Sequence, residues 1–273
     1  MATEQSNLAF KLSVGIPLLA VAAGAWYLSV VMVQSSPSMA MESSMSALPI
    51  ATMASVFTYP NAAIVSSFLL VWVVGMVAMM FPAMIPVISI YAKLGSNEGG
   101  KAGGRFAVPS LIFLTGYLSL YALLGIGLFG AVYFIFQLGA LFPLLSQFSL
   151  PAVAAVLFLA GVWQLTPLKE KSLTHCISPV GFFLTHSKKG SVGALRMGAE
   201  HGAYCVGCCW LYMLVMLAVA AMSLFSMVLL SGLIIVEKVF VGGRRWFKWF
   251  SAGAFFLLAA LALFFPASLA IGL

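Results

Sequence analysis

The sequence predicts an all-α, polytopic membrane helix bundle with about seven transmembrane helices and the N-terminus inside the cell. Composition is the first reason, since 63% of the 273 residues are hydrophobic and only 7% are charged. Apolar runs of about eighteen or more residues recur along the chain. A helix needs about 20 apolar residues, with a range of about 17–25, to cross a bilayer. The runs are continuous rather than alternating, so helices are favoured over strands.

Segments that contain proline, glycine or charge separate the apolar runs, and we treat residues 1–273 as one integral membrane domain. The first run is long enough to be a retained signal anchor rather than a cleaved signal peptide. The predicted spans are 12–33, 62–91, 106–137, 143–166, 199–219, 222–238 and 247–268.

Basic residues set the predicted orientation. Segments 92–105 and 167–200 contain three and five Lys or Arg, whereas 34–61 and 138–150 contain none. Since positively charged loops stay in the cytoplasm, 167–200 is expected to be a basic cytoplasmic loop and 34–61 an external one. The same loops account for the net charge of +7, so we expect no nucleic-acid partner.

Segment 201–236 is too long for one span, because 36 helical residues would extend ~54 Å. Basic residues lie on both sides of it, which requires an even number of crossings. We therefore predict two short spans that turn near Ala220–Ser223, with one long helix as the alternative.

The predicted external loop 34–61 is rich in methionine and serine. Thioether ligands suit Cu(I), so these methionines are candidates for copper capture. An apolar flap on the bilayer surface is the competing interpretation. The methionines are Met39, Met41, Met45 and Met53.

The strongest chemical signal is the run GAEHGAYCVGCCW, which begins at Gly198. On a helix His201, Cys205 and Cys208 share one stripe, and Cys209 lies one turn beyond Cys205. Imidazole with thiolates is a donor set for zinc, Cu(I) or an iron–sulfur centre. A membrane location favours Cu(I), with zinc as the alternative; thiol redox chemistry and simple packing are the other interpretations of the cysteines.

A second candidate ligand pair, Met80 and Met84, lies in the span that reads GMVAMMFPAMIPV. Both lie ~10–16 Å from the cytoplasmic end of their span, and Cys205 to Cys209 lie ~8–14 Å from theirs, at a rise of 1.5 Å per residue. Pro82 and Pro86 are expected to break this helix beside a cavity. A shared metal site is therefore geometrically possible, with packing as the alternative for the methionines.

Other polar residues have candidate roles as relay groups or as partners of nearby side chains. His175 and Cys176 form a soft pair in the predicted cytoplasmic loop, which suggests an entry relay. Glu200 is a candidate partner that orients His201, and Glu237 a candidate ion-pair partner of Lys238 in a neighbouring molecule or of Arg244. The chain contains no phosphate-binding loop, nucleophile elbow or HExxH motif, so a non-enzymatic role is favoured.

Four segments carry a resemblance to a known family: HGAYCVGCCWLYMLVM, WVVGMVAMMFPAMIPVISIY, LAGVWQLTPLKEKSLTHCISP and AMSLFSMVLLSGLIIVEK. Together they resemble the prokaryotic predicted metal-binding integral membrane proteins, a domain of unknown function with MMxP and GCCW motifs. The resemblance covers about residues 65 to 240 and implies a metal-binding multi-pass protein of a prokaryotic cell membrane.

The resemblance also points to individual residues. This chain has Ser172 and Ile177 where the family commonly has a cysteine and an arginine, which favours the intramembrane cluster over a loop site. The residues to which it points are Met79, Met80, Pro82, Pro86, Gln164, Pro167, Leu168, Lys169, Cys176, Gly202, Cys205, Gly207, Cys208, Cys209, Trp210, Glu237 and Lys238.

Three functions are consistent with these observations. The leading hypothesis is Cu(I) handling, as a transporter or as an accessory subunit that supplies metal to a membrane complex. The second is a membrane thiol oxidoreductase that uses the Cys205/Cys208 pair. The third is a structural subunit that packs against other membrane subunits through small-residue faces such as Gly125, Gly127 and Gly130.

Overall fold

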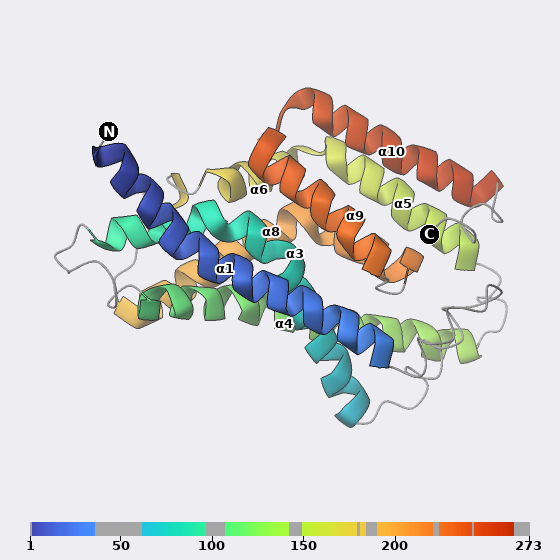
Figure 1. Ribbon diagram of the computed structural model, residues 1–273. Coiled ribbons are helices and arrows are strands. Elements are labelled where there is room, and N and C mark those ends of the chain that lie inside the picture. The colour runs from blue at the N-terminus through green and yellow to red at the C-terminus, as the bar shows by residue number, and fades with distance from the viewer. Residues whose placement is uncertain are drawn as a thin grey trace.

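The computed structural model describes residues 2–35, 62–96, 107–141, 149–178, 181–183, 190–220, 224–241 and 243–264. Every element within these ranges is helical, which confirms the all-α part of the predicted fold class (Figure 1). The elements are α1 (Ala2–Ser35), α3 (Ala62–Ser96), α4 (Ala107–Leu141), α5 (Ser149–Leu165), α6 (Pro167–Ile177), α8 (Gly190–Ala220), α9 (Leu224–Ile235), the π-helix η3 (Val236–Val241) and α10 (Arg245–Phe264).

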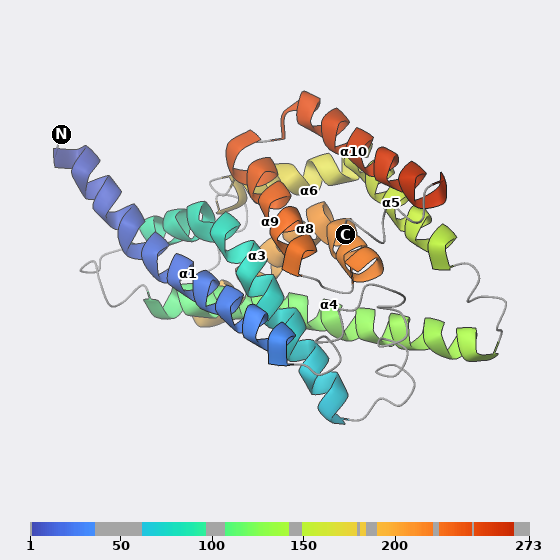
Figure 2. The same cartoon turned by 45° about the vertical axis from the view of Figure 1, so that its right-hand side comes forward.

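Three helix pairs organise the bundle. α1 packs along α3, α4 along α8, and α5 along α10. The short helix α6 also packs on α8, and α9 lies against α3 and α8. Figure 2 shows α5 and α10 as a pair on one side of the molecule and α1 with α3 on the other. α8 packs on α4, α5, α6 and α9, and α4 and α9 in turn contact α3, so α8 lies near the centre of the packing.

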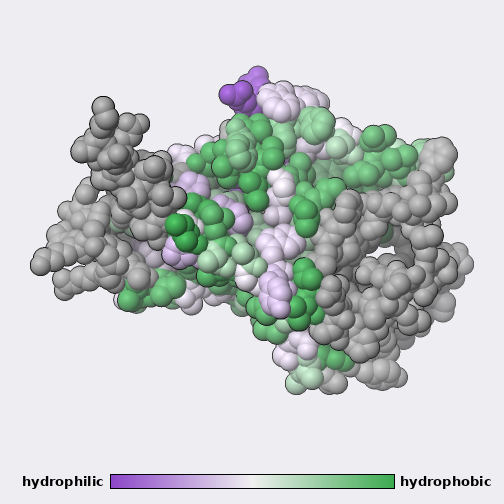
Figure 3. Space-filling model, in the orientation of Figure 1, coloured by the Kyte–Doolittle hydropathy of each residue, from purple (hydrophilic) through white to green (hydrophobic). Residues whose placement is uncertain are grey.

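Four described helical segments are long and apolar enough to cross a membrane: Val14–Met32, Ala62–Ala92, Val108–Ile135 and Arg245–Phe264. The segments Pro151–Leu165 and Pro167–Ile177 make a fifth if this bent pair is one span. Much of the face in Figure 3 is hydrophobic, as expected for a surface in contact with lipid. Length and composition thus support membrane localisation with four or five spans; seven spans and an internal N-terminus stay predictions.

The predicted break in segment 201–236 agrees with the structure, since α8 ends at Ala220 and α9 begins at Leu224. Segment 167–200 differs from the expected loop. It contains α6 and the first turns of α8. α6 begins with a proline that follows an N-cap residue, and its buried face packs on α8. Of the predicted external loop 34–61, only residues 34 and 35 are described, so its four methionines lie outside the described residues.

The prolines of α3 do not break that helix, contrary to expectation. α3 continues through Pro82 and Pro86 to Ser96. It changes direction along its course (Figures 1 and 2). A proline removes one backbone donor and crowds the preceding turn, so a helix that is packed on both sides bends there instead of ending.

Glycines allow α4 and α8 to approach closely. A Cβ added at Gly116 would lie 2.0 Å from the carbonyl oxygen of Leu195, and one at Gly198 would lie 1.9 Å from that of Phe113. Of the three glycines expected to pack against other subunits, Gly125 instead packs on Trp72 of α3, whose Cδ1 would lie 2.6 Å from an added Cβ, while Gly127 and Gly130 have nothing within 4 Å among the described residues of this chain, so a contact of these two with another subunit stays a prediction. The close contact with α8 lies about three to five turns earlier in α4, where it holds the tyrosine face of α4 against α8.

Candidate metal centre

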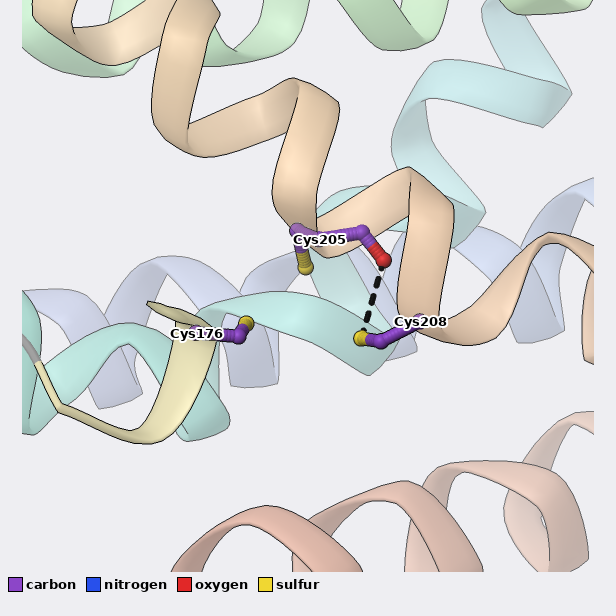
Figure 4. A group of neighbouring side chains, drawn as sticks. All are labelled: Cys176, Cys205 and Cys208. Atoms are coloured by element: carbon purple, nitrogen blue, oxygen red, sulfur yellow. Dashed lines mark hydrogen bonds between the residues drawn. The ribbon is translucent and has the colours of Figure 1, made fainter. Parts of the chain in front are cut away.

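Three cysteine sulfurs meet between α6 and α8. The Sγ atoms of Cys176, Cys205 and Cys208 all lie within 4.8 Å of one another, and all three residues are buried. Figure 4 shows Cys176 coming from α6 and the other two from successive turns of α8. Two sulfurs that share an ion at about 2.3 Å, the zinc–thiolate distance, lie up to about 4.6 Å apart. The cluster therefore fits a soft metal ion with only small side-chain movements.

The bend between α5 and α6 places Cys176 in this cluster. The two helices meet at 68°. Thr166 is the N-cap of α6 and its hydroxyl accepts a hydrogen bond from the Lys169 amide, while Pro167 occupies the start of the helix. The buried residues of α6 are Lys169, Leu173 and Cys176, which are spaced at four and three and so form one stripe facing the core.

A lysine also reaches the cysteines. Nζ of Lys238 donates a hydrogen bond to Sγ of Cys205 at 2.8 Å, and the lysine is only 9% exposed. Lys238 lies in η3, whose π-helical turn buries both Glu237 and Lys238. Consecutive residues on an ordinary helix lie about 100° apart, so a wider turn helps both side chains to face the interior. Thiolate ligands carry negative charge, and a buried ammonium beside them balances it.

Two tyrosines of α4 complete the polar surroundings of the thiols. The hydroxyl of Tyr117 lies 3.2 Å from Sγ of Cys205 and donates to the hydroxyl of Tyr121 at 3.3 Å. Tyr121 in turn lies 4.0 Å from Sγ of Cys209. Both rings are buried. The Tyr117 hydroxyl is thus placed to fix the position of the Cys205 sulfur.

The other predicted ligands on α8 surround the three-cysteine group without belonging to it. Sγ of Cys209 donates to the carbonyl of Cys205 at 2.8 Å, as Sγ of Cys208 does at 3.1 Å. His201 is 0% exposed, and neither of its ring nitrogens has a hydrogen-bond partner among the described residues. Its ring packs against Phe113, Tyr117 and Phe182. A buried imidazole without partners is unusual and suggests a ligand or ion nearby.

The predicted methionines, Met80 and Met84, are 1% and 2% exposed. They belong to the same buried cluster of side chains as Cys176, Cys205, Cys208 and Cys209. α3 therefore contributes its methionines to the core that contains the thiols, and the common depth of the two segments in the membrane stays a prediction. Their role as ligands stays a prediction.

The interaction partners of two glutamates differ from those expected. Glu237 pairs with Lys169, Nζ to Oε1 at 2.6 Å, rather than with Arg244 or with a neighbouring molecule. Glu200 pairs with Arg196 one turn earlier at 2.9 Å, and no hydrogen bond from a described residue reaches either ring nitrogen of His201, so Glu200 does not orient that ring by a hydrogen bond. Both outcomes depend on which side chains the fold brings within reach, because each acid had several cations nearby in the sequence.

The Lys169–Glu237 ion pair is the centre of a buried network. Tyr212 donates to Oε2 of Glu237 at 3.0 Å and accepts from Nζ of Lys169 at 3.1 Å. Gln164 bonds to Tyr212 and Lys169 and donates to Ser251 at 2.8 Å. The network joins α5, α6, α8, η3 and α10, so it fixes the two elements that carry Cys176 and Lys238.

From the residues alone, Cys176 was expected to form an entry relay with His175, and the family resemblance pointed to it as well. In the structure His175 stacks on Tyr204, while Cys176 joins Cys205 and Cys208. The spacing of Lys169, Leu173 and Cys176 was the available signal, since it places the cysteine on the buried face if the segment is a helix. The contact between Lys238 and Cys205 had no local signal, because 33 residues separate them in the chain.

A family model described as PpoB2, copper chaperone, matches residues 69–263. The matched region is well over half of the chain and contains α4, α5, α6, α8, α9, η3 and nearly all of α3 and α10. It includes every cysteine of the cluster, Lys238 and both candidate methionines. No curated protein and no solved structure matches the chain. With soft sulfur donors gathered in its core, the chain belongs to the PpoB2 copper chaperone family.

Proposed function

We propose that the protein is an integral membrane copper-handling protein that accepts Cu(I) at Cys176, Cys205 and Cys208 and passes it on. The observation that carries the proposal is the meeting of three buried sulfurs within 4.8 Å in a chain of a copper chaperone family. Cu(I) is a soft ion that thiolates and thioethers select. Closed zinc sites usually have four protein ligands, so a group of three cysteines favours Cu(I) over zinc.

The charge balance supports the same ion. If one of the three cysteines stays a neutral thiol, two thiolates and one Cu(I) carry a net charge of −1, and the ammonium of Lys238 beside Cys205 brings the buried site to zero. Burying a net charge is costly, whereas a neutral arrangement with hydrogen bonds is tolerated. A site of this kind holds copper without a counter-ion from solvent.

The neighbouring donors are proposed as transfer ligands. Cys209 and His201 lie on α8 with Cys205 and Cys208, and Met80 and Met84 of α3 belong to the same large buried cluster as the cysteines. Cu(I) binds two or three ligands readily, so it moves between sulfurs by exchanging one ligand at a time. Such a set suits delivery to a transport pathway or to a larger membrane complex, and the protein acts as a transporter or an accessory subunit.

We place the protein in a prokaryotic cell membrane, with seven spans and an internal N-terminus. The support is the distribution of basic residues, which gather near α6, the start of α8 and the turn before α10. Arg244 and Arg245 are exposed there, and Figure 3 shows a strongly hydrophilic patch over the beginning of α10. In this topology the thiol cluster lies towards the cytoplasmic side.

The test is copper stoichiometry of detergent-purified protein under reducing, anaerobic conditions, with competition against a Cu(I) chelator. Replacing Cys176, Cys205 or Cys208 by Ser should each lower the bound copper or its affinity. Cys209→Ser is the matched control, since its sulfur lies outside the group of three. Copper binding that survives a Cys176→Ser, Cys205→Ser, Cys208→Ser triple replacement would show the proposed site to be wrong.

A further inference from the structure

A polar cavity lies beside the thiol cluster but is not part of it. Its volume is about 290 Å³, and its walls come from α6, η3, the turn before α10 and the first turn of α10. Lys169 and Glu237 face it from the inside, and the Glu170–Lys248 ion pair, with N–O distance 2.7 Å, lines it as well. Small-molecule pockets have volumes of about 300–1,000 Å³, so the cavity is near the lower end of that range.

The walls of the cavity continue directly into the thiol cluster. Leu173 lines the cavity, and Cys176 follows it by one turn on the same buried stripe of α6. Glu237 lines the cavity, and Lys238, the next residue, contacts Sγ of Cys205. Two of the elements that border the cavity, α6 and η3, therefore also carry a residue of the metal centre, one turn or one residue beyond the cavity wall.

Leu173 belongs both to the cavity wall and to the buried cluster that contains the thiols. It is 3% exposed. Beside it lies Gly243, where an added Cβ would be 3.4 Å from Cδ2 of Leu173. Gly243 has a φ of +74°, so the turn before α10 can pass close to α6 at this point.

We propose that this cavity is the access vestibule of the metal centre, through which Cu(I) carried by a small hydrophilic thiol reaches Cys176, with Leu173 as the gate. The inference rests on the proposed copper function. The mixed charges of the walls suit a carrier that itself has carboxylates and an ammonium group. Transfer is a ligand exchange without redox change: the copper–sulfur bond to the carrier breaks as the bond to Cys176 forms, and the thiol proton of Cys176 passes to the departing carrier.

The gate is tested with a matched pair of substitutions on α6. Leu173→Ala removes the side chain that the cavity wall and the cluster share, whereas Leu168→Ala removes a leucine that is 63% exposed on the same helix. In metal-free protein, the labelling of Cys176 by a charged alkylating reagent, identified by peptide mass spectrometry, should become about tenfold faster in Leu173→Ala, which corresponds to about 1.4 kcal/mol in the barrier. Leu168→Ala should label at the wild-type rate.

The vestibule is tested in the opposite direction by Thr174→Trp, which places a large ring at an exposed position of the cavity wall. Loading of copper from the Cu(I)–glutathione complex should become slower by about tenfold, with the final stoichiometry unchanged. The position is exposed, so this variant should fold even if Leu173→Ala does not.

The results separate the two proposals. Wild-type rates of labelling and loading in both Leu173→Ala and Thr174→Trp would overturn the vestibule. A wild-type protein without cysteine-dependent copper would overturn the proposed function instead, and the labelling of metal-free protein would still show whether the cavity gives access to Cys176.

Discussion

Nζ of Lys238 lies 2.8 Å from Sγ of Cys205, and both residues are buried. The carboxylate next to this lysine in the chain, Glu237, is engaged by Lys169. The sulfur is thus the polar partner that the structure gives to the Lys238 ammonium within the described residues. A cation in this position stabilises the thiolate form of a cysteine, which is the form that ligates a metal.

Lys238→Met should therefore weaken copper binding. A hydrogen bond to a charged group contributes about 1.5–3 kcal/mol, so the Cu(I) affinity should fall by roughly ten- to a hundredfold. Competition with a Cu(I) chelator measures the change. Lys171→Met is the control, because Lys171 is exposed on α6 and should leave the affinity unchanged. Equal affinities of the Lys238→Met and wild-type proteins would exclude a role of the lysine at the centre.

Glu237→Gln should destabilise the fold more than it affects the metal. The carboxylate is 3% exposed and is bonded to Lys169 and Tyr212, and removal of one partner from a buried ion pair costs about 3–5 kcal/mol. Thermal unfolding in detergent should show a clear loss of stability. Glu170→Gln, which affects an exposed carboxylate paired with Lys248, is the matched control and should have little effect.

A double replacement, Lys169→Met with Glu237→Leu, tests whether the instability of Glu237→Gln comes from an unpaired buried charge or from altered packing. Because it leaves no unpaired buried charge, it should be more stable than Glu237→Gln alone. A double variant as unstable as the single one would contradict this account of the network.

Gly116→Ala should disturb the contact between α4 and α8. The added Cβ would lie 2.0 Å from the Leu195 carbonyl oxygen, so the helices must separate, and overpacking typically costs about 1–3 kcal/mol. Tyr117 would move away from Cys205, and labelling of Cys205 should become faster. Gly127→Ala on the same helix meets nothing within 4 Å and should keep or slightly raise stability. Similar unfolding temperatures for the two variants would contradict the close approach.

His201→Phe should raise the stability of the metal-free protein, and its rate of copper release tests whether His201 is a ligand. The imidazole nitrogens have no hydrogen-bond partner within the described residues, and an unsatisfied buried polar group costs about 1–3 kcal/mol. A phenyl ring among Phe113, Tyr117 and Phe182 should make the metal-free protein more stable. If His201 is a transfer ligand, the same variant should release copper to a chelator at an altered rate; an unchanged rate would identify it as a packing residue.

The sequence by itself determined the fold class, because continuous apolar runs in a chain with few charges are compatible only with buried helices in lipid. It also predicted that segment 201–236 is divided, since basic residues on both sides of it require an even number of crossings, and the described helices α8, to Ala220, and α9, from Leu224, agree with the division. The stripe of His201, Cys205 and Cys208 followed from helical spacing alone, and the resemblance to metal-binding membrane proteins agrees with the copper chaperone family.

Only the tertiary structure decided which donors meet. Cys176 reaches Cys205 because α5 and α6 bend by 68°, and Lys238 reaches it because the π-helical turn faces two consecutive residues inward. Glu237 joined Lys169, 68 residues earlier, rather than a nearby cation. Helical periodicity places side chains on a face, but the approach of two faces depends on bends, glycine contacts and buried ion pairs between distant segments, which no local pattern encodes.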